Sequence, residues 1–218
     1  MPNYDAVIFD NDGTLVDSAP GILKSANTAF AELGYPAMAM AQFRPFLGPP
    51  LRNSFMAFAG MSDGEAERAV AVYRREYAGG NCFILQIYPG VEDLLRKLRA
   101  AGIKTAVASS KPKMFLEKIF GGIGLRALFD AVCGPDPDNH DEGKADIIAE
   151  AARACGVPPA RCLMVGDRRF DVEGARALGM PCAGVLYGYG SREELEAAGA
   201  DFLAADCGAL SEYCLKTH

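Results

Sequence analysis

Three carboxylates lie close together near the N-terminus, in the stretch VIFDNDGTLVDSAPG that begins at Val7. Asp10 and Asp12 stand two residues apart where an apolar run stops, and Asp17 follows. Two carboxylates a few ångströms apart repel each other by about 4 kcal/mol at an effective dielectric constant of about 20. A cation or a lysine would turn that repulsion into a binding site. The NDG tripeptide by itself is also typical of a tight turn.

Further groups that could join this site occur later in the chain, after short apolar runs or, for Lys144, at the start of the helical pattern that leads into one. They are Ser109, Ser110 and Lys111 in ASSKP, Lys144, and Asp167 and Asp171 in VGDRRFD. Each segment alone could be a polar turn or a helix N-cap. Ligands of open α/β sheets, however, bind at the carboxyl ends of the strands. The repeated placement of polar groups after apolar runs therefore predicts one shared site, and its all-oxygen donor set favours Mg²⁺ over zinc.

The elements that must position these groups are short β-rich runs alternating with helical patterns. The runs cover residues 5–10, 103–109, 161–167 and 182–187 and begin again at 129 and 201. Between them, leucines and valines recur at helical spacing, as at Val91, Leu94, Leu95 and Leu98. Strands alternating with helices predict right-handed crossovers and a doubly wound parallel sheet, the α/β fold class.

Residues 16 to 88 interrupt this alternation, because they show helical periodicity and hardly any strand pattern. Apolar stripes run through residues 22–33, through Leu51, Phe55 and Phe58, and through residues 66–77, the last opened by a capping box from Ser62 to Glu65. We expect a small helical bundle inserted after the first strand.

Composition excludes several classes of protein. The net charge of -6 and the isoelectric point near 5.0 argue against nucleic acid or an acidic membrane surface as a partner. No apolar run is long enough to span a membrane, and the first residues lack a secretory signal, so we expect a cytoplasmic protein. A small anionic substrate remains compatible with a local cationic pocket.

Cysteine and histidine usage narrows the chemistry further. The seven cysteines are scattered and form no C-x-x-C pair, which indicates reduced, buried thiols. Only two histidines are present, His140 and His218. Carboxylates or lysines must therefore carry acid–base chemistry.

Taken in order, DNDGT, Ser109 in ASSKP, Lys144 and GDRRFD resemble the four motifs of the haloacid dehalogenase superfamily of phosphohydrolases. The resemblance covers nearly the whole chain. It implies a Rossmann-like core at residues 1–15 and 89–218, with a small α-helical cap at residues 16–88. The segments FLGPPLRNSF and GVLYGYGSREEL resemble a phosphoglycolate phosphatase-like or 5′-nucleotidase-like subgroup.

By this resemblance the chain hydrolyses a small phosphorylated metabolite with Mg²⁺ as cofactor. Asp10 would attack phosphorus and become an aspartyl phosphate, and Asp12 would protonate the leaving group and later take a proton from water. Lys144 would balance the charge of the nucleophile and the transferring group, and Asp171 would orient Lys144 or a metal-bound water.

The resemblance also implies the ligand sets. Asp10, the backbone carbonyl of Asp12 and Asp167 would hold Mg²⁺. The predicted phosphate-binding residues are Asn11, Gly13, Thr14, Ser109, Ser110 and Lys144. Arg44 and Arg52 in the cap and Lys111 near the site entrance are candidates for substrate specificity, against the alternative that they are solvated surface residues. The acidic segment PDPDNHDEG departs from the expected neutral or basic approach to Lys144, and we interpret His140 within it as a loop residue.

Three other functions use related site chemistry. A phosphomutase would share the aspartyl phosphate and convert a sugar phosphate without net release. A 2-haloacid dehalogenase needs the nucleophile but neither the metal nor the second acid, and Asp12 and Asp167 argue against it. A phospho-accepting receiver module needs no helical insertion of about seventy residues. The particular substrate and the oligomeric state cannot be predicted from the sequence.

Overall fold

The structure, a computed structural model, describes residues 4–48, 51–136 and 143–216, and the chain divides into two units. One unit, the core unit, comprises Met1–Val16 and Ile87–His218. The other, the helical unit, comprises Asp17–Gln86.

A six-stranded sheet in the order β5-β4-β1-β6-β7-β8 forms the centre of the core unit. The strands are β1 (Ala6–Phe9), β4 (Lys104–Ala108), β5 (Ala131–Cys133), β6 (Cys162–Gly166), β7 (Cys182–Val185) and β8 (Phe202–Ala204). Every neighbouring pair is parallel. The chain lays β4 and β5 on one side of β1 and then crosses to β6 on the other side. In open α/β sheets such a reversal of strand order creates the crevice in which ligands bind.

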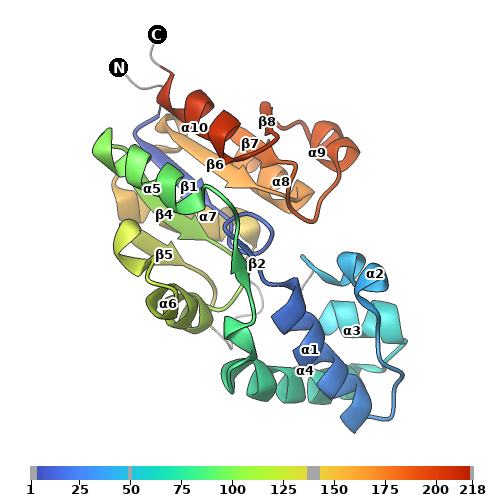
Figure 1. The fold of residues 1–218 in the computed structure, drawn as a ribbon. Coiled ribbons are helices and arrows are strands. Elements are labelled where there is room, and N and C mark those ends of the chain that lie inside the picture. The colour runs from blue at the N-terminus through green and yellow to red at the C-terminus, as the bar shows by residue number, and fades with distance from the viewer. Residues whose placement is uncertain (1–3, 49–50, 137–142, 217–218) are drawn as a thin grey trace. The chain divides into compact units, whose positions relative to one another are not determined.

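Helices cover the sheet because its central strands are apolar on both faces. In β1, Val7, Ile8 and Phe9 are all fully buried, as expected of a strand in a doubly covered parallel sheet. Ala6 and Ile8 pack in one hydrophobic cluster with α7 (Lys144–Cys155) and α8 (Arg169–Ala177). On the other face, α5 (Val91–Ala100) and α10 (Cys207–Leu215) pack against each other (Figure 1).

The core unit has four further helical elements among its described residues. They are α6 (Lys113–Gly122), α9 (Arg192–Ala198) and the 3₁₀ turns η3 (Arg126–Leu128) and η4 (Pro159–Arg161). Where the chain passes from one unit to the other, β2 (Val16–Asp17) pairs with β3 (Gln86–Ile87).

Four helices and two 3₁₀ turns are described in the helical unit. These are α1 (Ala19–Glu32), α2 (Met40–Phe43), η1 (Arg44–Phe46), α3 (Leu51–Ala59), α4 (Asp63–Ala78) and η2 (Asn81–Phe83). An aromatic cluster packs inside the unit, with the ring of Phe55 lying 5.4 Å from Phe30 and 5.2 Å from Phe46 in edge-to-face geometry. The capping box predicted at the start of α4 is present, since the Ser62 amide donates to Glu65 Oε2 at 2.9 Å.

The predicted fold class is confirmed, because each β-rich run of the sequence forms a strand of one parallel sheet with helices packed on it. One detail of the predicted helical stripes is wrong. Phe58 was expected to be buried with Phe55, but it is 41% exposed because it lies in the last turn of α3, at the end of the packed stripe. None of the described helices combines the length and the apolar character needed to cross a membrane.

Candidate active site

The strand register brings the predicted groups to one edge of the sheet. Phe9, the last residue of β1, pairs with Val107 of β4 and Val165 of β6. The three strands therefore end level with one another, and the Asp10 amide continues the pairing by donating to the Val165 carbonyl at 2.9 Å. The residues that follow the strands, with Asp10 first, emerge side by side.

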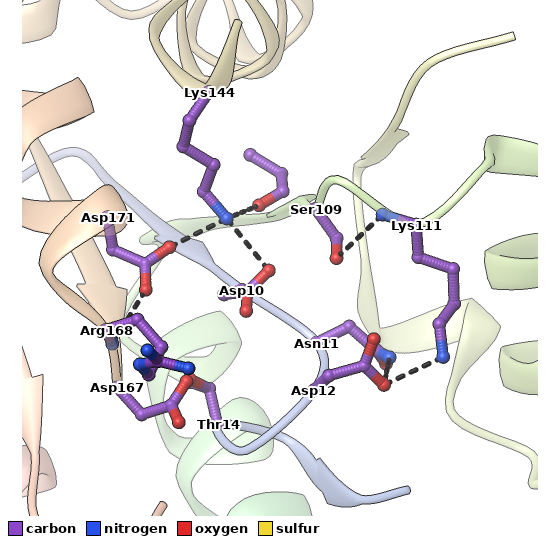
Figure 2. A network of polar contacts seen from close by, with 11 residues as sticks. Asp10, Asn11, Asp12, Thr14, Ser109, Lys111, Lys144, Asp167, Arg168 and Asp171 are labelled. Atoms are coloured by element: carbon purple, nitrogen blue, oxygen red, sulfur yellow. Dashed lines mark hydrogen bonds and ion pairs between the residues drawn. The ribbon is translucent and has the colours of Figure 1, made fainter. Parts of the chain in front are cut away.

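Lys144 is the first residue of α7, and its ammonium group lies among three oxygen atoms (Figure 2). Nζ donates to Asp10 Oδ1 and to the Ala108 carbonyl, each at 2.9 Å, and lies 2.7 Å from Asp171 Oδ1. An ammonium carries three protons, so each can be directed at one of these atoms. The lysine thereby links the ends of β1 and β4 to the start of α8.

The site holds more negative than positive charge. Asp10, Asp167 and Asp171 are buried, and each offers a carboxylate oxygen within 4.8 Å of the others. The ion pairs that Lys144 forms reach only two of these three carboxylates, Asp10 and Asp171, among the described side chains. One ammonium against three carboxylates leaves a negative balance that a divalent cation would neutralise, and the all-oxygen donor set fits Mg²⁺. Asp10 and Asp167 are the two of these carboxylates that we predicted to hold it, and Asp167 is the one that forms no ion pair with Lys144 among the described side chains.

Burial and neighbouring charges both shift the pKa values of these groups. Burial raises the pKa of Asp10 to about 6, against the opposing effect of Lys144. Burial also raises the pKa of Asp167, and the negative charges of Asp171 and Asp10 add to that rise. For Lys144, burial by itself would lower the pKa, but the attraction of Asp10 and Asp171 outweighs it and raises the pKa above its ordinary value.

Asp167 is held in place from two sides. The Tyr189 amide donates to Oδ2 at 2.7 Å, and the Thr14 hydroxyl donates to Oδ1 at 3.3 Å. Tyr189 belongs to the loop Gly188–Tyr189–Gly190 that follows β7. A Cβ atom at Gly190 would overlap the Asp167 carbonyl oxygen, so the loop approaches this closely only because it has no side chain there.

The turn after β1 carries Asp12 on its side. Gly13 adopts a φ of 84°, which few other residues tolerate, and its amide donates to the Val16 carbonyl at 2.9 Å. Asp12 Oδ1 accepts two hydrogen bonds of 2.8 Å, from Asn11 Nδ2 and from Lys111 Nζ (Figure 2).

The serines of ASSKP have different environments. Ser109 is buried at the end of β4, and its hydroxyl oxygen accepts the Lys111 amide at 3.4 Å. Ser110 is exposed. All of these residues belong to the core unit and were predicted as site residues: Asp10, Asn11, Asp12, Gly13, Thr14, Ser109, Ser110, Lys111, Lys144, Asp167 and Asp171.

The predictions for the remaining residues stay predictions. Arg44 and Arg52 belong to the helical unit, in which Arg52 forms an ion pair with Asp63. His140 lies outside the described residues.

Three groups in the assembly were not predicted as site components in these roles: the Tyr189 amide, the Ala108 carbonyl and the Asn11 side-chain amide. The first two are backbone atoms, which leave no trace in residue type. The glycine pair around Tyr189, following an apolar run at the same sheet edge, was the available signal for a loop that packs tightly on the site.

Comparison with known proteins identifies the family of this chain. Residues 7–185 match the model of the haloacid dehalogenase-like hydrolase family. The chain therefore belongs to this family, and the resemblance drawn from the four motifs is confirmed.

Relatives that are similar along most of this chain carry different names. A 5′-nucleotidase of Pseudomonas aeruginosa is 34% identical over 99% of this chain and 97% of its own length. A phosphoglycolate phosphatase of Pseudomonas savastanoi is 33% identical over 84% of this chain and 70% of its own length. The tyrosine-protein kinase PtkA of Mycobacterium tuberculosis is 35% identical over 87% of this chain, which spans 65% of that protein.

A solved structure supports the same assignment. The crystal structure of a predicted phosphatase from Clostridium acetobutylicum has a TM-score of 0.90 and 35% sequence identity, and it covers 96% of this chain and 97% of its own. The protein is accordingly a phosphatase of the haloacid dehalogenase-like family.

Proposed function

We propose that the protein is a Mg²⁺-dependent phosphomonoesterase that hydrolyses a small phosphorylated metabolite through an aspartyl phosphate at Asp10. The observation that carries this proposal is the arrangement of Lys144 between Asp10 and Asp171, with the buried Asp167 beside them. In this geometry Lys144 contacts the Asp10 carboxylate, so it can hold the nucleophile in position and offset part of its charge.

In the first step, an oxygen of Asp10 attacks phosphorus while the bond from phosphorus to the ester oxygen breaks. The electron pair of that bond goes to the leaving oxygen, and the Asp12 carboxyl group gives it a proton. In the second step, Asp12 takes a proton from the water that hydrolyses the aspartyl phosphate, and Asp10 is regenerated.

Other residues act on charge and orientation. Lys144 neutralises Asp10 and the transferring group, and the Ser109 hydroxyl donates to a phosphate oxygen. Asp10, Asp167 and the Asp12 carbonyl would hold Mg²⁺, and the bound ion would supply positive charge that offsets the repulsion between the phosphate dianion and the carboxylates. Phosphate contacts by Asn11, Gly13, Thr14 and Ser110 stay predictions, and in this structure the Gly13 and Thr14 amides close the turn after β1.

For the substrate, we infer a nucleoside monophosphate or a phosphoglycolate-like acid. The support is that a relative matched along almost its whole length is named 5′-nucleotidase, and others are named phosphoglycolate phosphatase. The role of residues 16–88 as a substrate cap, with Arg44 and Arg52 as recognition groups, stays a prediction. So does a cytoplasmic location without nucleic-acid or membrane partners.

The test is phosphate release by the purified protein with Mg²⁺ from a panel of nucleoside monophosphates, phosphoglycolate and sugar phosphates. We expect turnover that EDTA stops and that Asp10→Asn abolishes. Asp93→Asn makes the same chemical change at an exposed ion pair with Lys97 on α5 and serves as the matched control.

Three results would contradict the proposal. Turnover retained by Asp10→Asn would exclude the aspartyl phosphate. Activity that survives EDTA would exclude Mg²⁺ dependence. A sugar phosphate that isomerises while phosphate release stays flat would indicate a phosphomutase.

A further inference from the structure

Asn11 is a polar residue in a fully buried position. It directly follows the apolar strand β1 and is 0% exposed. Burying an amide is unfavourable unless its donors and acceptors find partners. The Nδ2 group has one, Asp12 Oδ1 at 2.8 Å, whereas Oδ1 of Asn11 has no hydrogen-bond partner among the described residues. The hydrogen bond to Asp12 therefore accounts for the buried amide group at this position.

Lys111 reaches the same oxygen from a distant part of the chain. Its side chain is only 7% exposed, and its Nζ lies 2.8 Å from Asp12 Oδ1. The lysine follows β4 and is separated from Asp12 by 99 positions, so the contact depends on the tertiary fold. Buried lysines are rare unless paired, because removing the ammonium from water is costly.

The two lysines of the site are divided between its two groups of carboxylates. Lys144 contacts Asp10 and Asp171, and Lys111 contacts Asp12. Two donors converging on one oxygen from different segments restrict the rotation of the Asp12 carboxyl group, which neither donor could do alone. Orientation of this kind matters for proton transfer, which requires donor and acceptor within hydrogen-bond reach.

We propose that Asn11 and Lys111 are positioning residues that hold the Asp12 carboxyl group where it can protonate the leaving group. This inference rests on the proposed function, in which Asp12 is the proton donor. It also replaces the expectation that Lys111 recognises the substrate with a role inside the reaction.

The experiment compares two substrates whose leaving groups differ in their need for a proton. An alkyl phosphate releases a basic alkoxide, whereas p-nitrophenyl phosphate releases a stable phenolate. For Lys111→Met and for Asn11→Leu we expect kcat/KM, which reports the step in which the leaving group departs, to fall about 10- to 100-fold for the alkyl phosphate and by less than about threefold for p-nitrophenyl phosphate.

Three further variants sharpen the comparison. Lys111→Arg keeps a cation and should recover part of the kcat/KM for the alkyl phosphate that Lys111→Met loses. Lys113→Met removes an exposed lysine two positions away and should match the wild type on both substrates. In an Asp12→Ala background, adding Lys111→Met or Asn11→Leu should cause no further loss of leaving-group selectivity, since residues acting through a common group are not additive.

The outcomes separate this inference from the proposed function. If Asp12→Ala itself affects both substrates equally, Asp12 is not the proton donor and both proposals fail. If Asp12→Ala lowers kcat/KM selectively for the alkyl phosphate but Lys111→Met and Asn11→Leu lower kcat/KM equally for both substrates, the positioning role is overturned while the proposed function stands. Should Lys111→Met fail to fold, as judged by circular dichroism, Asn11→Leu and Lys111→Arg decide the question.

Discussion

At the scale of single residues, Asp10 is buried at a cost that the lysine beside it offsets only in part. Burial raises the pKa of Asp10 to about 6 even though Lys144 Nζ lies 2.9 Å from its oxygen. Asp167, with its own raised pKa, adds to the surplus of negative charge. The folded protein without a cation therefore favours the protonated forms of both carboxyl groups more than the unfolded chain does.

The stability of the metal-free protein should consequently fall as pH rises through the acidic range. A group whose pKa is raised on folding contributes stability fully below its ordinary pKa, 3.8 for Asp10, and loses that contribution as pH rises through about 6. Lys144 stays protonated throughout this range and does not alter the trend. In EDTA we expect the free energy of unfolding to fall by about 1–3 kcal/mol between about pH 4 and pH 7 relative to that of Asp10→Asn.

Denaturant unfolding at a series of pH values measures this difference. Asp93→Asn, at an exposed ion pair, should follow the wild-type curve. A wild type that gains stability relative to Asp10→Asn over the same range would show that Lys144 more than compensates the burial of Asp10.

Residue types in the sequence were enough to anticipate the members of the site, but only part of its connections. Asp10, Lys144 and Asp171 could be grouped from their order in the four motifs, and the structure places Lys144 in contact with both aspartates. The contact of Lys111 with Asp12 could not be anticipated, since it depends on the path of the chain between β4 and α6. Side-chain pairing across 99 positions has no local signature.

At the scale of elements, the strands were predictable and the loops that hold the site were not. Apolar runs such as AVIF and CLMVG indicate buried strands. Parallel pairing then places the carboxyl ends of these strands at the same edge of the sheet. The loop after β7 acts through the Tyr189 amide, which every residue except proline possesses. Sequence therefore identified the carboxylate of Asp167 but not the group that orients it.

Gly190→Ala tests how closely that loop must approach. The added Cβ would overlap the Asp167 carbonyl oxygen, so the loop, the aspartate or both must move. We expect a loss of about 1–3 kcal/mol in the free energy of unfolding, as for other overpacked sites, together with weaker Mg²⁺ binding. Denaturant unfolding and calorimetric titration with Mg²⁺ measure the two effects.

Gly121→Ala is the matched control, because a Cβ there meets no atom within 4 Å and the residue lies in α6. Alanine should be neutral or slightly stabilising at that helical position. If Gly190→Ala unfolds like the wild type and binds Mg²⁺ equally well, the close approach of the loop does not position Asp167.

At the scale of the whole molecule, the core unit has a hydrophobic cluster of its own. The hydrophobic cluster on the α7 and α8 face of the sheet draws all its residues from the core unit, between Ala6 and Ile8 and between Ala106 and Leu203. The chain also leaves and re-enters the core unit at neighbouring points, because the Tyr88 amide donates to the Leu15 carbonyl at 3.1 Å. A long insertion between two such points adds little to the entropy of closing the loop.

We therefore expect the core unit to fold when residues 18–85 are replaced by a Gly/Ser linker of about four residues. The shortened protein should unfold cooperatively, bind Mg²⁺ and hydrolyse p-nitrophenyl phosphate, because every charged group of the site is retained.

If the helical unit acts as a substrate cap, the value of kcat/KM for the preferred metabolite should fall at least about 10-fold more than that for p-nitrophenyl phosphate. Near-UV circular dichroism, calorimetry and paired kinetics measure these properties, and Asp10→Asn in the shortened protein controls for contaminating phosphatase. A shortened protein without a cooperative transition would show that the core depends on the helical unit, and equal losses on both substrates would argue against a cap that selects the substrate.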